Sequence, residues 1–330
     1  MTPAEVKKRR YSLSRDQLLG IVDDQELFAS LDGVLQTELV ARLASVDPQV
    51  TVQRALDGKI SEKIFNGVRL NPVLFTNQEE FASGLLQSLD LTDPLQQAIH
   101  SKVFMAGMEG APAVVVKSLL LRKKKDASYQ IGSGYKIALR QLYASNPAQA
   151  VSAVTANTVE GSAERASSLF IIGQEISNHP EGEGTLGLDS ISDKDLEALK
   201  TGKTAALLRA GNASGLELLK ALPNESLLSV ISQQPSFAGL CKIDPQGAID
   251  LISRIDMPTE AKGALEIAAN TLIRKNKALV LDWITQQPDS EKKFAALRGS
   301  INYLEKTSAP DLEDWKKMLP DSRPSDIGDE

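Results

Sequence analysis

The sequence predicts an all-α fold, an α-solenoid in which about nine antiparallel helix pairs stack one on the next. Two segments 32 residues apart, LDWITQQPDS (281–290) and EDWKKMLPDS (313–322), are identical at five of ten positions. A fixed period of this length is typical of stacked repeats. Aromatic residues make up only 5% of the 330 residues, which suits helix pairs filled by Ala, Leu and Val better than a β-sandwich or barrel.

The first elements precede the repeats. Residues 1–13 are expected to form a disordered basic arm, because Lys and Arg fill positions 7–10. Two helical patterns follow, each a stripe of apolar residues at three- and four-residue spacing. The first contains Leu18, Leu19 and Val22, and the second contains Leu31, Val34, Leu35, Leu39 and Leu43. This pair is predicted to cap the array.

The helical-repeat domain is predicted to span residues 14–322, with units that begin near residues 47, 79, 111, 146, 178, 212, 244, 276 and 308. Most units open with Asn or Asp, which are good N-cap residues, and several continue with proline, which fits the first helical position. A break such as Pro288-Asp289-Ser290 then separates the first helix from the second. In the second helix of that unit, Gly299 would let a neighbouring helix approach closely. One hairpin cannot bury both apolar stripes alone, whereas stacked hairpins share a continuous core.

Two stretches depart from this pattern. Residues 177–193, SNHPEGEGTLGLDSISD, are the most loop-like in the chain and suit a surface insertion or a hinge between two sub-arrays. The last unit is predicted to keep only its first helix, with Leu312, Trp315 and Leu319 facing inward. Residues 323–330 are expected to be a disordered tail.

The repeat pattern also carries a resemblance. The pattern (Asn/Asp)-Pro-x-x-Ala-φ-x-x-φ, as at Asn146-Pro147 and Asp244-Pro245, precedes a short break and a second helix rich in small residues. It resembles the degenerate helical-pair repeats of large uncharacterised bacterial proteins, notably of the planctomycete–verrucomicrobial type, over about residues 47–322. The resemblance implies an α-solenoid, a superhelix of the HEAT-like or TPR-like kind, and no established activity. The sequence lacks the tetratricopeptide order of Trp, Leu, Gly and Tyr and the ankyrin Thr-Pro-Leu-His.

Composition and charge narrow the classes of protein. Cys241 is the one cysteine, so an intrachain disulfide is impossible, which is compatible with a reducing compartment. No run of about 20 apolar residues predicts a membrane span. No leader is visible, so a cytoplasmic location is expected, and a periplasmic or envelope location would follow if a leader had been removed. Residues 1–150 carry 18 Lys/Arg against 16 Asp/Glu, and residues 151–330 carry 19 against 27, a balance that argues against a nucleic-acid binder.

Two glycine motifs look like phosphate loops but lack the required context. Residues 182–187 spell G-x-G-x-x-G, yet the dinucleotide motif needs a strand before it and a helix directly after it. Thr201-Gly202-Lys203-Thr204 resembles the end of a P-loop, but Glu197 stands where that motif requires its first glycine. The favoured interpretations are a loop for the first motif and a break between two helices, with Gly202 at the corner, for the second.

The sequence assembles no catalytic set, so no catalytic residue, cofactor site or metal site is predicted. Two histidines and one cysteine are too few for a His/Cys zinc site. His100 is interpreted as a satisfied, partly buried histidine and Cys241 as a small core residue. His179 lies in the acidic loop, where a weak metal or pH-sensing role is the alternative to a solvated side chain.

A basic cluster is the best candidate for binding a partner. The alternative is a solvated helix end, where cations complement the negative end of the helix dipole. The candidate residues are Arg122, Lys123, Lys124, Lys125, Lys136 and Arg140. Trp283 and Trp315 occupy equivalent positions of the repeat, and core filling is favoured over an exposed binding ladder.

These observations favour a non-enzymatic scaffold that binds an unknown protein or peptide, with no small-molecule substrate and no nucleic acid implied. One alternative is an envelope-associated structural protein whose leader has been removed. Another is an enzyme or ligand-binding protein with its site in residues 177–193.

Overall fold

The computed structural model describes residues 1–186, 191–254 and 261–320. Every regular element in these ranges is helical, and no β-strand occurs among them, so the predicted all-α class is confirmed. By its internal contacts the chain divides into two compact units, Met1–Arg165 and Ala166–Glu330. The sequence predicts one helical-repeat domain over 14–322.

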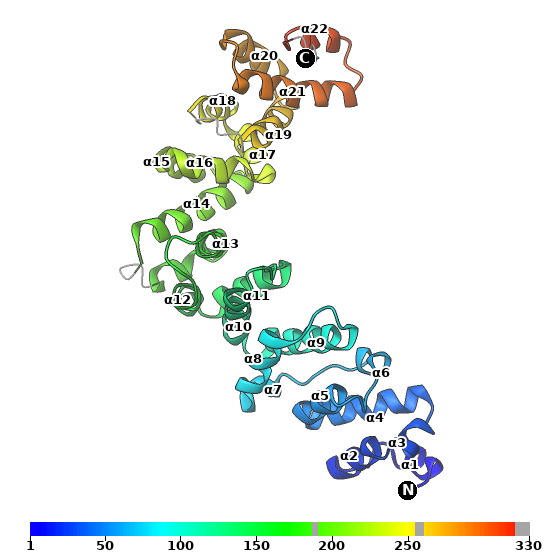
Figure 1. Ribbon diagram of the computed structural model, residues 1–330. Helices are drawn as coiled ribbons and strands as arrows, with labels where there is room; N and C mark the ends of the chain where they lie inside the picture. Colours follow the sequence, from blue (N-terminus) through cyan, green and yellow to red (C-terminus); the bar gives the residue numbers. More distant parts are fainter. Residues whose placement is uncertain (187–190, 255–260, 321–330) are drawn as a thin grey trace, which may run out of the picture. The chain divides into compact units, whose positions relative to one another are not determined.

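The first unit contains twelve complete helices within the described residues (Figure 1). They are α1 (Pro3–Arg9), α2 (Arg15–Asp23), α3 (Gln25–Ala29), α4 (Gly33–Val46), α5 (Pro48–Leu56), α6 (Glu62–Asn66), α7 (Val73–Asn77), α8 (Glu79–Ser88), α9 (Pro94–Gly110), α10 (Pro112–Lys125), α11 (Ser133–Ser145) and α12 (Pro147–Asn157). Most packing joins helices that are close in the chain, for example α4 with α2, α5 and α6, and α10 with α8, α9, α11 and α12.

The second unit begins three residues into α13 (Ala163–Asn178). Its other elements are the 3₁₀ helix η1 (Pro180–Thr185), then α14 (Asp193–Arg209), α15 (Ser214–Ala221), α16 (Asn224–Ile231), α17 (Gln234–Ile243), α18 (Pro245–Arg254), α19 (Ala261–Ile273), α20 (Lys277–Gln286), α21 (Glu291–Lys306) and α22 (Leu312–Lys316). Within this unit α14, α17, α19 and α21 each pack on the next (Figure 1).

The N-terminal arm is not disordered, which corrects the expectation for residues 1–13. Thr2 and Glu5 form a capping box that starts α1, in which the Glu5 carboxylate accepts a bond from the Thr2 amide at 2.7 Å. Val6 and Leu13 are buried. The prediction of disorder was based on the run of basic residues and neglected these two apolar side chains. Their burial holds the segment on the core.

Five helices begin where the Asn/Asp and proline signals place them. Asp47, Asn146 and Asn276 accept bonds from first-turn amides of α5, α12 and α20 at 3.1, 3.0 and 3.0 Å. The Asp244 carboxylate does the same for Gly247 in α18 at 2.8 Å. Helix α10 starts with a proline behind Ala111, with no side-chain cap. The predicted starts near 178 and 308 are wrong, because α13 continues through residue 178 and α22 begins only at Leu312.

The expected helix through residues 31–43 is confirmed as α4, with one exception on its stripe. Leu35, Leu39 and Leu43 are buried, but Val34 is 72% exposed. Val34 lies in the first turn of α4, and the three- and four-residue spacing from Leu35 sets the buried face. Leu31 is buried just ahead of the helix.

Glycines let packed helices of the second unit touch through their backbones. A Cβ atom on Gly202 of α14 would lie 2.0 Å from the Phe170 carbonyl oxygen of α13. A Cβ on Gly239 of α17 would lie 1.8 Å from the Leu208 oxygen of α14, and one on Gly299 of α21 would lie 2.0 Å from the Glu266 oxygen of α19. No other amino acid fits such contacts without separating the helices. The predicted close approach at Gly299 is confirmed.

The remaining predicted breaks have mixed outcomes. Ser290 caps α21 at the predicted break, accepting a bond from the Lys293 amide at 3.3 Å. The expected loop at 177–193 contains the end of α13, η1 and the start of α14, while residues 187–190 lie outside the described ranges. The tail expected at 323–330 also lies outside them.

Candidate functional site

Arg122, the first residue of the predicted basic cluster, is buried and forms hydrogen bonds inside the first unit. Its Nη1 donates to the Leu86 carbonyl at 3.2 Å and its Nη2 to the Leu89 carbonyl at 2.7 Å, at the C-terminal end of α8. Its guanidinium also lies over the Tyr129 ring, 4.7 Å from the ring centre. Because these contacts engage both Nη atoms of a buried side chain, Arg122 is a poor candidate for binding a partner.

Lys123 and Lys124 line a cavity of about 320 Å³ in the first unit. The Lys123 ammonium donates to the Ala127 carbonyl at 2.5 Å. The cavity is also lined by the end of α12, by Thr158 and Ser162 after it, and by Glu164 in the first turn of α13. No residue of α11 lines this cavity. Glu164 places a negative charge among the lysines, so the cavity is of mixed charge.

The other three members of the cluster lie elsewhere. The Lys125 ammonium donates to Gln87 Oε1 of α8 at 3.0 Å. Lys136 and Arg140 are exposed and one helical turn apart on α11. The structure therefore distributes the six predicted residues over the interior, a cavity, a contact with α8 and the outer face of α11, and it does not bring them together into one site.

The outer face of α11 also carries a feature that the sequence predictions miss. Ile137, between the two basic residues, is 55% exposed, and Met105 of α9 is 54% exposed. The two residues are 32 positions apart, which is the repeat spacing. That spacing is the signal that could have found them, but an apolar residue on a helix is expected first in the core.

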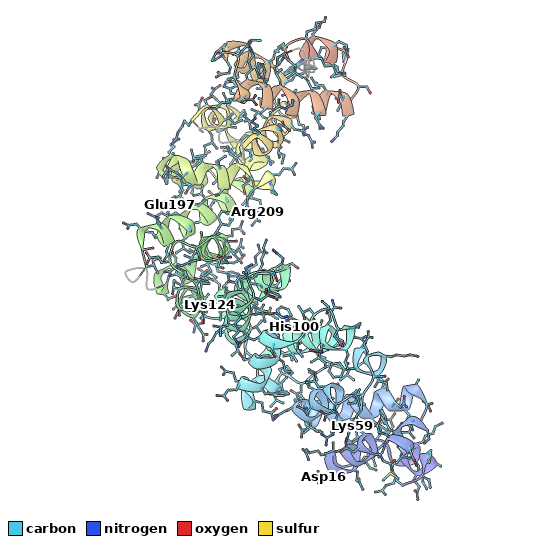
Figure 2. The ribbon with its side chains drawn as sticks, in the orientation of Figure 1. Asp16, Lys59, His100, Lys124, Glu197 and Arg209 are labelled. Atoms are coloured by element: carbon cyan, nitrogen blue, oxygen red, sulfur yellow. The ribbon has the colours of Figure 1, made fainter. Side chains whose placement is uncertain are left out.

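His100 lies on α9 (Figure 2), within reach of the positive charge of the buried Arg122. Burial, and after it the positive charge of Arg122, lower the pKa of His100 to about 4 from an ordinary 6.5. Its Nε2 atom is buried with no hydrogen-bond partner among the described residues. The interpretation as a partly buried histidine is thus confirmed, but the expectation that it is fully satisfied is wrong.

The other groups considered for chemistry are held in structural roles. Cys241 is buried in the core of the second unit, and burial raises the pKa of its thiol to about 12, so it is a core residue as predicted. His179 Nδ1 lies 3.6 Å from Glu181. Among the described residues, no group of three or more His, Cys, Asp or Glu side chains is placed to hold a metal ion.

Neither glycine motif has the context of a phosphate loop. The residues of G-x-G-x-x-G that the structure describes lie in and next to η1, directly after a helix and not after a strand. Thr201-Gly202-Lys203-Thr204 lies inside α14, so the expected break at Gly202 is wrong. Gly202 is needed for contact with α13, and the Lys203 ammonium pairs with Glu183 at 2.8 Å.

Both tryptophans fill the core of the second unit, as favoured. Trp315 is buried, and its indole nitrogen donates to Asp311 at 3.1 Å. Trp283 is also buried, and its indole nitrogen donates to the Ser253 hydroxyl at 3.0 Å. Both positions are therefore core positions, but their indole partners differ: Trp283 bonds to α18, whereas Trp315 bonds to the N-cap of its own helix, α22.

Comparison with protein-family models, with curated proteins and with solved structures found no match for this chain. The arrangement of its own residues therefore carries the argument about function. Within the ranges that the structure describes, no helix combines the length and the apolar composition needed to cross a lipid bilayer.

Proposed function

We propose that this chain is a non-enzymatic helical-repeat scaffold, an α-solenoid that binds a protein partner. Its repeats would belong with the degenerate helical-pair repeats that the sequence resembles. A solenoid is a platform whose units contact their neighbours in series and leave long helix faces open to other proteins.

The observation that carries the proposal is the repeated backbone contact through glycine in the second unit. Three glycines each place their own helix against a backbone carbonyl of an earlier helix. They are Gly202 of α14, Gly239 of α17 and Gly299 of α21. Repetition of one packing device along the chain is expected of serial units and not of a single globular core. The recurrent Asn/Asp helix starts support the same arrangement.

The state of the chemically active side chains supports a non-enzymatic role. A thiol whose pKa is raised to about 12 is protonated at neutral pH and is a poor nucleophile. His100 is partly buried and neutral at pH 7, because its pKa is lowered to about 4, and Arg122 is engaged with the Leu86 and Leu89 carbonyls at the end of α8. These groups stabilise the fold, which leaves surface recognition as the best-supported activity.

The test is to crosslink the full-length recombinant chain in lysate of its native organism, identify reproducible partners, and rebuild the complex from purified proteins. We expect a complex of fixed stoichiometry by size-exclusion chromatography and a saturable heat of binding by calorimetry. Self-association alone, or no rebuilt complex, would count against a scaffold. A thermal shift with nucleotides or divalent metals would instead favour a ligand-binding protein or an enzyme.

A further inference from the structure

Met105 and Ile137 are two large apolar side chains that lie more than half exposed on neighbouring helices of the first unit. Single exposed apolar residues are ordinary on protein surfaces, whereas adjacent ones mark interaction sites more often. The question is therefore whether these two residues form one surface.

The contacts between α9 and α11 place Met105 and Ile137 beside the same seam, which is the line along which these two helices meet. A Cβ atom on Gly134 of α11 would lie 3.0 Å from the Phe104 ring of α9. Further along, Gln141 Nε2 of α11 donates to the Met108 carbonyl of α9 at 2.7 Å. Met105 lies between Phe104 and Met108, as Ile137 lies between Gly134 and Gln141. Since both contacts join residues about one repeat apart, the two apolar side chains flank the seam at the same level.

Basic residues border this apolar pair. The charged Lys, Arg, Asp and Glu side chains within α9 and α11 are Lys102, Glu109, Lys136 and Arg140. The single acid, Glu109, is paired with Arg69 at 2.6 Å. The Lys102 ammonium donates to the Asn66 carbonyl at 2.8 Å, a contact with a neutral acceptor that leaves its charge unbalanced. Lys102 and Lys136 thus place positive charge on the two helices that carry the apolar pair, although the whole chain has a net charge of −6.

We propose that the α9–α11 face, defined by Met105, Ile137, Lys102 and Lys136, binds an acidic amphipathic helix of a partner protein. This inference rests on the proposed scaffold function and names its surface and partner class. The apolar stripe of such a helix covers Met105 and Ile137, and its carboxylates face the basic border. The unbranched thioether of Met105 adapts to side chains of different shape.

The probe is a fluorescein-labelled synthetic peptide of about 18 residues, with leucines on one helical stripe and glutamates on the flanking positions. Two control peptides accompany it: a scrambled sequence of the same composition, and a version with lysine in place of glutamate. With the full-length chain, fluorescence anisotropy is expected to show saturable binding of the acidic stripe peptide, at least about tenfold tighter than either control. The affinity is expected to fall as salt is raised, because the charges at the border are screened.

Variants of the chain locate the binding. The double variant Met105→Ser/Ile137→Ser is expected to weaken binding about tenfold, because it removes the apolar contact at the seam. Lys136→Glu is expected to weaken it about threefold or more through charge reversal. Val46→Ser is the matched apolar control, since Val46 is 58% exposed on α4, and Lys200→Glu is the charge control on α14. Circular dichroism and the Tm confirm that each variant is folded.

Three results would overturn the inference: equal binding of the scrambled peptide, equal binding of the lysine peptide, or unchanged affinity in the double variant. Its failure is distinguishable from failure of the scaffold function. If a rebuilt complex with a natural partner binds the Met105→Ser/Ile137→Ser variant as tightly as the original chain, the scaffold stands and this face is excluded. If neither the probe nor any protein binds, both proposals fall.

Discussion

At the residue scale, the second unit depends on glycines that no other residue can replace. The would-be Cβ of Gly299 meets the Glu266 carbonyl oxygen at 2.0 Å. That oxygen belongs to a helix backbone, so a rotamer change cannot relieve the clash. Asn270 Nδ2 also donates to the Gly299 carbonyl at 3.1 Å, and Arg298 pairs with Glu266 at 2.7 Å. These polar contacts hold α19 and α21 at a separation that only glycine permits.

Gly299→Ala is therefore expected to lower the free energy of unfolding of the second unit by about 1–3 kcal/mol, the usual cost of overpacking. The measurement is urea denaturation followed by tryptophan fluorescence, because Trp283 and Trp315 both lie in that unit. Gly263→Ala in α19 is the matched control, since no atom lies within 4 Å of its would-be Cβ. That variant is expected to gain up to about 1 kcal/mol. A similar effect of the two substitutions would contradict close backbone packing at Gly299.

His100 gives the first unit a specific pH dependence. The unfolded chain binds a proton at this residue below about pH 6.5, whereas the folded chain binds it only below about pH 4. The folded state therefore has its full stability above pH 6.5 and loses stability as the pH falls towards 4, by up to about 3 kcal/mol. Removing the imidazole in His100→Leu is expected to abolish this slope between pH 6.5 and 4.5, as measured by urea denaturation with circular dichroism. His179→Gln should retain the slope of the original chain, and an unchanged slope in His100→Leu would refute the assignment.

Single residues also show what the sequence could and could not predict. Gly299 was predictable because a glycine in the middle of an apolar helical pattern implies close packing. The role of Gly202 was not predictable, because a Thr-Gly pair is equally typical of a helix end. Only the contact with the Phe170 carbonyl of α13 shows that Gly202 serves close helix packing and does not end a helix. Both glycines contact a carbonyl of another helix, about which local spacing carries no information, so only the clear apolar pattern on both sides of Gly299 made its role predictable.

At the element scale, helix starts follow from local chemistry and were largely predictable. An Asp or Asn side chain that accepts a first-turn amide acts within four residues, so sequence alone identifies it. Helix α1 shows the limit, because Val6 is buried only through contacts formed in the folded unit. The basic cluster shows another limit. Four consecutive helical residues point in four directions at 100° intervals, so Arg122–Lys125 could not form one patch.

Arg122 connects two elements, α10 and the C-terminal end of α8. Arg122→Ala is expected to lower the free energy of unfolding by about 2–3 kcal/mol, because it leaves the Leu86 and Leu89 carbonyls without their charged donor. Arg122→Lys should recover only part of this, since an ammonium cannot reproduce the forked guanidinium contact. The measurement is urea denaturation followed by circular dichroism.

The control is Lys124→Ala on the same helix turn, which is expected to change the free energy by less than about 0.5 kcal/mol, as is usual at exposed positions. If Arg122→Ala changed the free energy of unfolding as little as Lys124→Ala does, the contacts of Arg122 with α8 would not stabilise the fold. Arg122 would then again be a candidate for binding a partner.

At the scale of the whole molecule, the chain is two units with different charge. The first carries 19 Lys/Arg against 18 Asp/Glu, and the second carries 18 against 25. The second unit has a contiguous apolar core that extends from Leu208 of α14 to Trp315 of α22. Since the contacts of serial helices are local, each unit is expected to retain its fold when the covalent link to the other is cut. The segment between α12 and α13 provides the place to cut, because Val159, Glu160 and Gly161 are exposed.

Brief digestion of the native chain with a glutamate-specific protease is expected to cleave after Glu160 first. Exposed loop backbone fits a protease site, whereas helical backbone does not. Gly161, with φ of +75°, lies directly after the scissile position. The separated fragments should keep the helical circular dichroism of the intact chain and melt cooperatively, each with its own Tm. Glu160→Gln should resist this first cut. Loss of helicity in both fragments would show that neither unit holds its fold by itself, and would contradict the serial arrangement on which the scaffold proposal depends.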